Sequence, residues 1–415
     1  MRNNTIRIFS ALLFALLLAF TVFGTTSCGE SSSTVTELYV YNWGEYISDG
    51  SEDSLDSNEA FEEWYWETYG ERVKVTYSTF SSNEDMYAKL SAGAVSYDVI
   101  VPSDYMIERL IDEDMLAPLD YSNIPNIVNI APEFYGENAQ FDYYDEGNVY
   151  SVPYFYGMIG IIYNTEMVDE EDIGSWDLMW NEKYAGNILQ FNNSRDAFGS
   201  AQYFLGLDVN SDNEAEWRMA LEKLREQKEI VQGYVMDEIF NKMQSGSAAI
   251  SAYYAGDFLT MYEENDSLEF YYPEEGTNLY IDAMCIPKTS QNKLVAERYI
   301  NFMLMEEPAI ANAEYTYYAS PNRLVRENPD YIDYMNEIKE DAYQKIYETD
   351  GIKTQAYGNL PGEQLAMINN LWEELKSDIT VSPVIYTMCA VIVLTLIAFA
   401  VFFLVRKRVR ASYYD

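Results

Sequence analysis

The sequence predicts an α/β protein with mainly parallel sheets, organised as two lobes with an apolar segment at each end of the chain. Short apolar runs typical of buried strands alternate with stretches of helical periodicity, which indicates βαβ units. The chain has 415 residues, long for one compact domain. A local repeat, LSAGAVSYDVIVPSDY at 90–105 and MQSGSAAISAYYAGD at 243–257, supports two related lobes, with chance similarity of two turns as the alternative.

Strands and helices alternate in the first half of the chain. Leu38–Tyr41 and Tyr97–Val101 are short apolar runs that predict buried strands, and Val73–Tyr77 alternates with the period of a strand. Helical spacing of apolar residues predicts helices over Phe61–Tyr69 and Met106–Leu116. This order predicts parallel strands joined by helices.

The second half repeats the pattern. Gly157–Tyr163 and Asn187–Phe191 are candidate strands, and Trp217–Glu229 is a candidate helix. Ser211–Glu214 precedes that helix with the spacing of a capping box, so we expect the helix to begin there.

A fragment of a calcium-loop pattern lies just before that helix. Asp208, Asn210 and Asp212 stand where the first three ligands of such a loop would be. Asn213 replaces the required glycine, and Met219 replaces the bidentate glutamate, so we do not expect calcium here.

The net charge of the chain indicates which kinds of ligand it favours. The formal net charge is −42, and only Asp415 among the 68 acidic residues lies outside residues 29–383. Such a field repels nucleic acid and anionic ligands and favours cationic ligands. The alternative interpretation is that most of this charge keeps the protein soluble or adapts its surface to salt.

Histidine is absent from the sequence, which excludes Ser–His–Asp catalysis, Cys–His catalysis and histidine-ligated metals. Cys28, Cys285 and Cys389 lie in three separate regions, so Cys285 alone cannot form a disulfide within the body of the protein. We expect packing to stabilise the fold, and no cofactor or metal.

The first 28 residues predict an export signal. Arg2 and Arg7 precede the apolar run Ala11–Phe20. The sequence ending at Cys28 resembles a bacterial lipobox, although Thr25 stands where that pattern prefers leucine. Lipidation of Cys28 is therefore one expectation, and ordinary cleavage or an uncleaved anchor is the other. Residues 29–36 are a Ser/Thr-rich linker.

The C-terminal end predicts a transmembrane helix over Val384–Val405, a segment without charge. At about 1.5 Å per residue it is long enough for the hydrocarbon core. The basic residues Arg406, Lys407, Arg408 and Arg410 follow it, so the tail 406–415 is expected in the cytoplasm and the body outside. A buried core helix is the alternative.

Short sequence matches along the body resemble the spermidine/putrescine-binding protein family, the solute receptors of polyamine ABC importers. The matching segments, in chain order, are YNWGEY at 41–46, YSTF at 77–80, YDVIVPSDY at 97–105, VPY at 152–154, GIIYN at 160–164, YIDAMCIP at 280–287, YINFM at 299–303 and SPN at 320–322. Together they extend the resemblance over roughly residues 37 to 378.

The resemblance implies a periplasmic-binding-protein-like fold of two lobes that close on a ligand, without chemistry. Lobe 1 would comprise 37–152 and 282–326, and lobe 2 would comprise 153–281 and 327–378. The protein would capture spermidine or putrescine in the cleft between the lobes and deliver it to an ABC permease driven by a separate ATPase. It would lie on the extracytoplasmic face of the cell membrane. The C-terminal span is not part of the usual family pattern.

The resemblance also supplies ligand-binding residues suited to a polyamine, whose buried ammonium groups need carboxylates and whose methylenes need aromatic walls. Asn193 stands where the family often has an aspartate, and Asp257 is close enough to Tyr253 in sequence to compensate. The expected ligand-binding residues are Trp43, Glu45, Tyr46, Ser103, Tyr105, Asn193, Asp196, Tyr253, Asp257, Tyr280, Asp282 and Tyr318.

Each of these residues also has a structural interpretation. Trp43 and Tyr253 could be core residues, Glu45 and Asp282 could be solvated acids, and Ser103 could cap a helix. Asp196 could form a surface ion pair with the neighbouring arginine.

Three other functions remain open from the sequence. The same fold could bind another cationic amine or an amino acid, although Arg195 is the only basic residue next to the expected ligand-binding residues that could hold a carboxylate. A membrane-tethered sensor ectodomain would account for the C-terminal span. An extracellular hydrolase lacks support, because the sequence contains no GxSxG elbow and no metal-ligand spacing.

Overall fold

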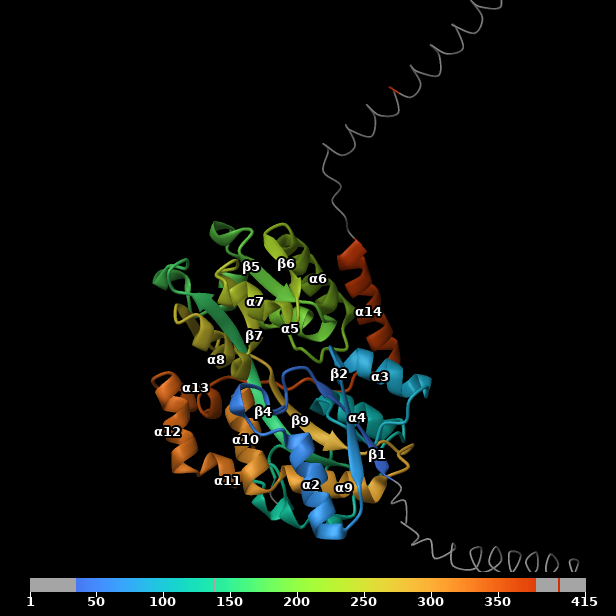
Figure 1. Ribbon diagram of the computed structural model, residues 1–415. Coiled ribbons are helices and arrows are strands. Elements are labelled where there is room, and N and C mark those ends of the chain that lie inside the picture. The colour runs from blue at the N-terminus through green and yellow to red at the C-terminus, as the bar shows by residue number, and fades with distance from the viewer. Residues whose placement is uncertain (1–34, 137–138, 378–394, 396–415) are drawn as a thin grey trace, which may run out of the picture. The chain divides into compact units, whose positions relative to one another are not determined.

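The computed structural model describes residues 35–136, 139–377 and 395 (Figure 1). Several predicted segments lie outside these residues. They are the signal segment with Cys28, almost all of the linker, all but one residue of the span Val384–Val405, and the tail 406–415. Within the described ranges, no helix is both long enough and apolar enough to cross a membrane.

The chain divides into two compact units, each with its own core. Unit 1 comprises the described residues of 1–158, together with 254–263 and 279–350. Unit 2 comprises 159–253, 264–278 and the described residues from 351 onward. Two lobes are expected from the sequence, but residues 153–158, 254–263, 279–281 and 327–350, all assigned to the second lobe, belong to unit 1.

Unit 1 is built on strands in the order β2-β1-β3-β9-β4. β1 pairs in parallel with β2 and β3, whereas β9 runs antiparallel to β3 and β4. The strands are β1 (Thr36–Trp43), β2 (Val73–Phe80), β3 (Val99–Ile100), β4 (Ser151–Asn164, which continues into unit 2) and β9 (Leu279–Cys285).

Helices surround these strands in unit 1, and Phe61 on α2 packs edge-on against Tyr299 on α9 with ring centroids 5.0 Å apart. The helices are α2 (Ser57–Tyr69), α3 (Asn83–Ala92), α4 (Asp104–Asp112), α8 (Ala255–Glu264), α9 (Lys293–Met303), α10 (Glu306–Thr316), α11 (Arg323–Arg326), α12 (Pro329–Ile338) and α13 (Ala342–Tyr347), with 3-10 turns η1 (Ser51–Asp53), η2 (Tyr121–Asn123) and η3 (Pro125–Asn129).

Tyrosine packing explains why α12 and α13 belong to unit 1. Tyr347 lies 6.1 Å from Tyr331 and 6.3 Å from Tyr156 between ring centroids. Its hydroxyl also accepts a hydrogen bond of 3.1 Å from the backbone N–H of Ser320. The resemblance, which predicts a lobe boundary at residue 326, gives no information on these contacts.

Unit 2 continues β4 and has the strand order β4-β7-β5-β6, with β8 on β4. β5 is parallel to β6 and β7, and β8 is antiparallel to β4. Its elements are η4 (Glu170–Asp172), η5 (Trp176–Trp180), η6 (Glu182–Tyr184), β5 (Ile188–Phe191), α5 (Ser194–Leu205), α6 (Glu214–Lys228), β6 (Val231–Val235), α7 (Glu238–Gln244), β7 (Ile250–Tyr254), β8 (Leu268–Tyr271) and α14 (Gly362–Ser377).

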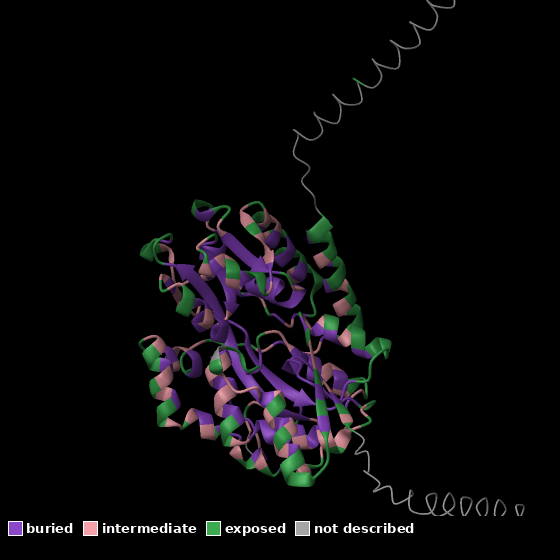
Figure 2. Cartoon of the chain, viewed as in Figure 1, coloured by how far each residue is buried: buried purple, intermediate pink, exposed green. Residues whose placement is uncertain are grey.

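The sheets are mixed rather than mainly parallel. The long strand β4 and the strand β9 are buried at every described position and run antiparallel to each other from Ser151↔Cys285 to Met158↔Leu279. Continuous apolar runs predict buried strands but carry no information on their direction. Figure 2 shows the central strands such as β4 and β9 as buried, whereas exposed residues gather mainly on the helices and loops.

The two halves of the sequence repeat adopt the same local structure. In each, a helix ends at a glycine in the left-handed region, Gly93 at φ 62° or Gly246 at φ 67°. A strand follows, β3 or β7, and then a helix, α4 or α8. Each strand pairs in parallel with a neighbour, so the two halves of the repeat share the same local fold.

The start of α6 differs from the expected capping box. Asn213 is the N-cap residue, and its side chain accepts a hydrogen bond of 3.0 Å from the backbone of Ala215. The backbone carbonyl of Ser211 instead accepts a hydrogen bond of 2.8 Å from the indole of Trp217.

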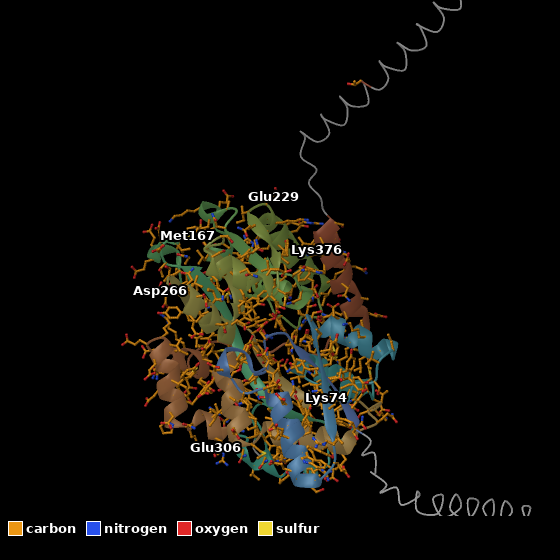
Figure 3. The ribbon with its side chains drawn as sticks, viewed as in Figure 1. Lys74, Met167, Glu229, Asp266, Glu306 and Lys376 are labelled. Carbon is orange, nitrogen blue, oxygen red and sulfur yellow. The ribbon has the colours of Figure 1, made fainter. Side chains whose placement is uncertain are left out.

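Charged side chains lie on the outside, among them Lys74 and Glu306 in unit 1 and Glu229 and Lys376 in unit 2 (Figure 3).

Candidate ligand-binding site

The loop after β1 carries three of the expected ligand residues. Trp43 ends the strand, is half-buried, and packs its ring 4.5 Å from that of Phe80. Its indole N–H is buried and has no acceptor among the described residues. Glu45 is exposed and adopts φ 49°, which is uncommon for a residue with a side chain and reverses the chain so that Tyr46 turns inward.

Tyr46 and Asp282 form the centre of the site in unit 1. The Tyr46 hydroxyl donates a hydrogen bond of 2.6 Å to Oδ2 of Asp282, which is only 4% exposed. Burial, together with the neighbouring carboxylate, raises the pKa of Tyr46 well above its usual value, so the hydroxyl remains a donor. Asp282 is therefore a buried acid bonded to a phenol, and the alternative interpretation of a solvated loop acid is wrong for it.

Aromatic rings surround that pair. Tyr46 makes edge-on contacts with Phe155 at 5.2 Å and with Tyr318 at 4.7 Å between ring centroids. Tyr318 in turn donates a hydrogen bond of 2.8 Å to Oδ2 of Asp257 on α8. Two carboxylates in unit 1 are thus each bonded to a tyrosine, and the two tyrosines touch.

Ser103 and Tyr105 lie next to the same centre. Ser103 pairs with Asp282 across an isolated antiparallel bridge. The side-chain amide of Asn83 donates to the Ser103 hydroxyl at 3.0 Å and to the Tyr105 hydroxyl at 3.1 Å, and Tyr105 donates to Glu84. Ser103 occupies the N-cap position of α4, but its side chain makes no capping hydrogen bond there, so the capping interpretation is not supported.

Tyr280 completes the expected set in unit 1. It is buried on β9, and its ring lies edge-on to that of Tyr254 at 5.4 Å. A Cβ at Gly157 on the paired strand would lie 2.6 Å from the Tyr280 hydroxyl oxygen. Glycine at position 157 therefore makes the space that this aromatic side chain occupies.

An acidic cavity in unit 1 contains two of the expected acids. Its volume is about 470 Å³, and the described residues that line it include no lysine or arginine. Burial raises the pKa of Glu314 there. The carboxylates and tyrosines on its wall are Glu45, Asp53, Asp257, Glu263, Glu314, Tyr315, Tyr317 and Tyr334.

Most of these lining residues were missed from the sequence. Tyr317 lies at the end of α10 with φ 59°, donates to Oε2 of Glu263 at 2.8 Å, and stacks on Tyr334 at 6.3 Å between centroids. Glu263 is on α8 and Tyr334 on α12, far apart in the chain. Nothing in their local sequence marks them as neighbours, because only the packing of α12 on unit 1 brings them together.

Unit 2 holds the remaining expected residues. Asn193 caps α5, accepting a hydrogen bond of 2.9 Å from the backbone of Asp196 and donating one of 2.7 Å to Oδ2 of Asp196. Both residues are thus joined at the helix N-terminus, where the dipole favours the carboxylate. Tyr253 is buried and stacks on Phe191 with centroids 5.6 Å apart, which agrees with the core interpretation of this residue.

Arg195 is not a surface residue. It is 3% exposed, lies over the ring of Tyr357 at 4.5 Å, and donates to the side chain of Asn210 at 3.1 Å. The alternative interpretation of Asp196, a surface ion pair with Arg195, is therefore wrong as to place, because the guanidinium is buried in the core of unit 2.

The fragment of a calcium loop has another use. Asp208 accepts a hydrogen bond of 2.6 Å from Gln355, and Asn210 donates to the carbonyl of Ala356 and accepts from the N–H of Gly358. These side chains bind the C-terminal segment of unit 2. Among the described residues, no cluster of three or more Cys, Asp or Glu side chains could hold a metal ion.

Comparison with known proteins gives consistent matches over this region. Residues 59–339 match the family of bacterial extracellular solute-binding proteins. The spermidine/putrescine-binding periplasmic protein of Salmonella typhimurium is 31% identical over 309 residues, which is 73% of this chain and 83% of that protein. Its Escherichia coli K12 counterpart is 31% identical over 292 residues, which is 70% of this chain and 78% of that protein.

A solved structure shows the same relationship. The substrate-binding protein of a spermidine/putrescine ABC transporter from Streptococcus pneumoniae is 35% identical, with a TM-score of 0.63, and the alignment covers 82% of this chain and 98% of that one. The family match contains the expected ligand residues from Ser103 to Tyr318, whereas Trp43, Glu45 and Tyr46 precede it.

Proposed function

Because this chain belongs to the bacterial extracellular solute-binding protein family, we propose that it captures a polyamine, spermidine or putrescine, for delivery to an ABC permease. The family resemblance seen in the sequence is confirmed by the same matches. Proteins of this family are solute-binding components of importers, so the chain is not an enzyme.

The observation that carries the proposal is the buried pair of Tyr46 and Asp282. A carboxylate that is 4% exposed is costly unless its charge is compensated, and a ligand ammonium group supplies that compensation. The rings of Tyr46, Phe155 and Tyr318 beside it offer faces and edges to a methylene chain and attract a cation, by about 0.5–2 kcal/mol for each suitable face.

Each proposed residue has a role that follows from its chemistry. Asp282 pairs with one ammonium group, Tyr46 orients that carboxylate, and Trp43, Tyr280 and Tyr318 flank the carbon spacers. In unit 2 we propose that Asp196, oriented by Asn193, is the acid that meets another ammonium group, and that Tyr253 lies beside it. Ser103, Tyr105, Glu45 and Asp257 complete the proposed set.

We further propose that the body is held at the membrane. The family acts outside the cytoplasm, and either a lipid on Cys28 or the apolar segment 384–405 would anchor it there. Delivery then requires a permease and a separate ATPase as partners. Protease added to intact cells should remove the body and leave the C-terminal tail, whereas a fully protected body would reverse this topology.

Titration calorimetry with spermidine, putrescine, agmatine and arginine tests the ligand. We expect heat with at least one polyamine and none with arginine. No heat with any polyamine would overturn the proposal.

Two variants test the site in the same assay. Asp282→Asn and Glu45→Gln should each weaken polyamine binding by roughly 1.5–3 kcal/mol, the range for a hydrogen bond to a charged group. Glu306→Gln, an exposed acid at the start of α10, is the matched control and should bind like the parent. Parental affinity in both site variants would show that the site has been misplaced.

A further inference from the structure

Asp104 is a buried carboxylate that none of the roles above uses. It is the first residue of α4, directly after Ser103, and is 1% exposed. Ser103 bridges to Asp282, and the N–H of Ala283 donates to the carbonyl of Pro102 at 3.1 Å. Asp104 therefore lies at the junction of α4 and β9, beside the acid proposed to hold the ligand.

Two hydrogen-bond donors hold the Asp104 carboxylate. The Tyr143 hydroxyl donates to Oδ2, and the N–H of Tyr105 donates to Oδ1 at 2.8 Å. Because Pro102 and Ser103, just before Asp104, pair with Ala283 and Asp282 of β9, these hydrogen bonds hold the start of α4 against the strand that carries the ligand acid.

The surroundings of Asp104 are poor in positive charge. Burial is the main cause that raises the pKa of Asp104 to about 7, and the negative charge of Asp282 raises it further. The hydrogen bonds from Tyr143 and Tyr105 lower the pKa and so oppose this rise. The titratable groups that face it are Asp282 on β9 and Tyr143 and Tyr144 in the loop before β4, while Glu108 of α4 acts on Tyr143.

The sequence repeat supplies an independent parallel. Asp104 follows Gly93 at the same separation at which Asp257 follows Gly246, and each acid lies in the first turn of the helix after a strand. Each also accepts a hydrogen bond from a distant tyrosine, Tyr143 for Asp104 and Tyr318 for Asp257. The same local structure thus places a tyrosine-bonded buried acid at both positions.

We propose that Asp104 is a positioning residue that exchanges a proton against the ligand: it carries a proton while the site is empty and releases that proton to solvent when an ammonium group pairs with Asp282. The inference rests on the proposed function. A cation beside Asp282 compensates both carboxylates at once, whereas in the empty site two neighbouring buried acids disfavour ionising together.

The direction of the pH effect follows from linkage. Ligand binding lowers the pKa of Asp104, so the bound state holds fewer protons than the empty state between the two pKa values. Polyamine affinity should therefore rise with pH across that interval and level off above it, by at most about tenfold per pH unit.

Calorimetry in two buffers of different ionisation enthalpy measures the released proton directly. For the parent protein with spermidine we expect net proton release near about pH 7 that disappears well above it. Asp104→Asn should abolish the release. Asp112→Asn, the same substitution at an exposed position of the same helix, should retain it.

A second variant keeps the test decisive if Asp104→Asn fails to fold. Tyr143→Phe removes one donor from the carboxylate at a residue that is 46% exposed, so it should move proton release to higher pH. Binding heat without proton release from the parent protein would overturn this inference while leaving the proposed function intact. Equal release from Asp104→Asn and Asp112→Asn would do the same. Absence of any binding heat would overturn the proposed function, and this inference with it.

Discussion

The Tyr46 hydroxyl and the Asp282 carboxylate are 2.6 Å apart, although 236 positions separate them in the chain. Tyr46 follows the first strand, and Asp282 lies on the last strand of the same unit. The pair joins the beginning of unit 1 to the strand β9 and gives the acid a fixed orientation.

Tyr46→Phe should lower the free energy of unfolding by roughly 1.5–3 kcal/mol, because the buried Asp282 carboxylate loses a hydroxyl donor while the ring stays in place. Polyamine affinity should fall as well, since the acid is no longer oriented. Urea unfolding and calorimetry measure the two effects. Tyr39→Phe removes an exposed hydroxyl bonded to Glu37 and should change neither, so equal effects in both variants would contradict the role of Tyr46.

Asn193→Asp should tighten spermidine binding by up to about tenfold, or about 1.4 kcal/mol, by placing a second carboxylate beside Asp196. Aspartate caps helices as well as asparagine does, so α5 should remain intact. Two adjacent acids repel in the empty protein, so its melting temperature should fall. Asn213→Asp, the same change at the N-cap of α6, should leave binding unchanged. Unchanged spermidine affinity in Asn193→Asp would show that Asn193 and Asp196 are not part of the binding site.

Gly256→Ala should destabilise unit 1 by about 1–3 kcal/mol, because an added Cβ would lie 2.5 Å from the ring of Tyr318. Moving that ring breaks its hydrogen bond to Asp257, so polyamine binding should weaken too. Thermal unfolding and calorimetry provide the measurements. Gly233→Ala meets nothing within 4 Å and is the control. Two variants of equal stability would mean that the Tyr318 ring can move without cost.

The stability of the ligand-free protein should depend on pH through the titration of Asp104. Its pKa is raised from 3.8 to about 7, so between these values the folded state binds more protons than the unfolded state. Stability from this group is therefore present below its unfolded pKa and is lost as pH rises to the folded value. Across this range, the melting temperature of Asp104→Asn should rise relative to that of the parent protein as pH increases. Parallel curves for the two proteins would exclude a titration at Asp104.

Local sequence predicted those elements that have a clear periodic or apolar pattern, but fewer than half of the strands and helices of the described residues. Apolar runs and helical spacing located the strands around Leu38, Tyr97 and Val73 and the helices α2 and α4, because these patterns depend on neighbours in the chain. The same patterns gave neither the antiparallel direction of β9 nor the membership of α12 and α13, since both depend on partners distant in sequence.

The candidate site divides in the same way. Resemblance pointed to Asp282, Tyr46 and Tyr318, and the structure joins them in one network. Glu263, Glu314 and Tyr334 were missed, because their neighbourhood forms only when α8, α10 and α12 pack together.

By itself the sequence determined the family, the alternation of strands and helices, the strong negative charge and the absence of histidine chemistry. Only the tertiary structure decided which acids are buried, which tyrosine bonds to each acid, and that Asp104 lies near Asp282. The reason is physical: periodicity and charge are properties of neighbouring residues, whereas burial and hydrogen-bond partners are set by contacts between strands and helices far apart in the chain.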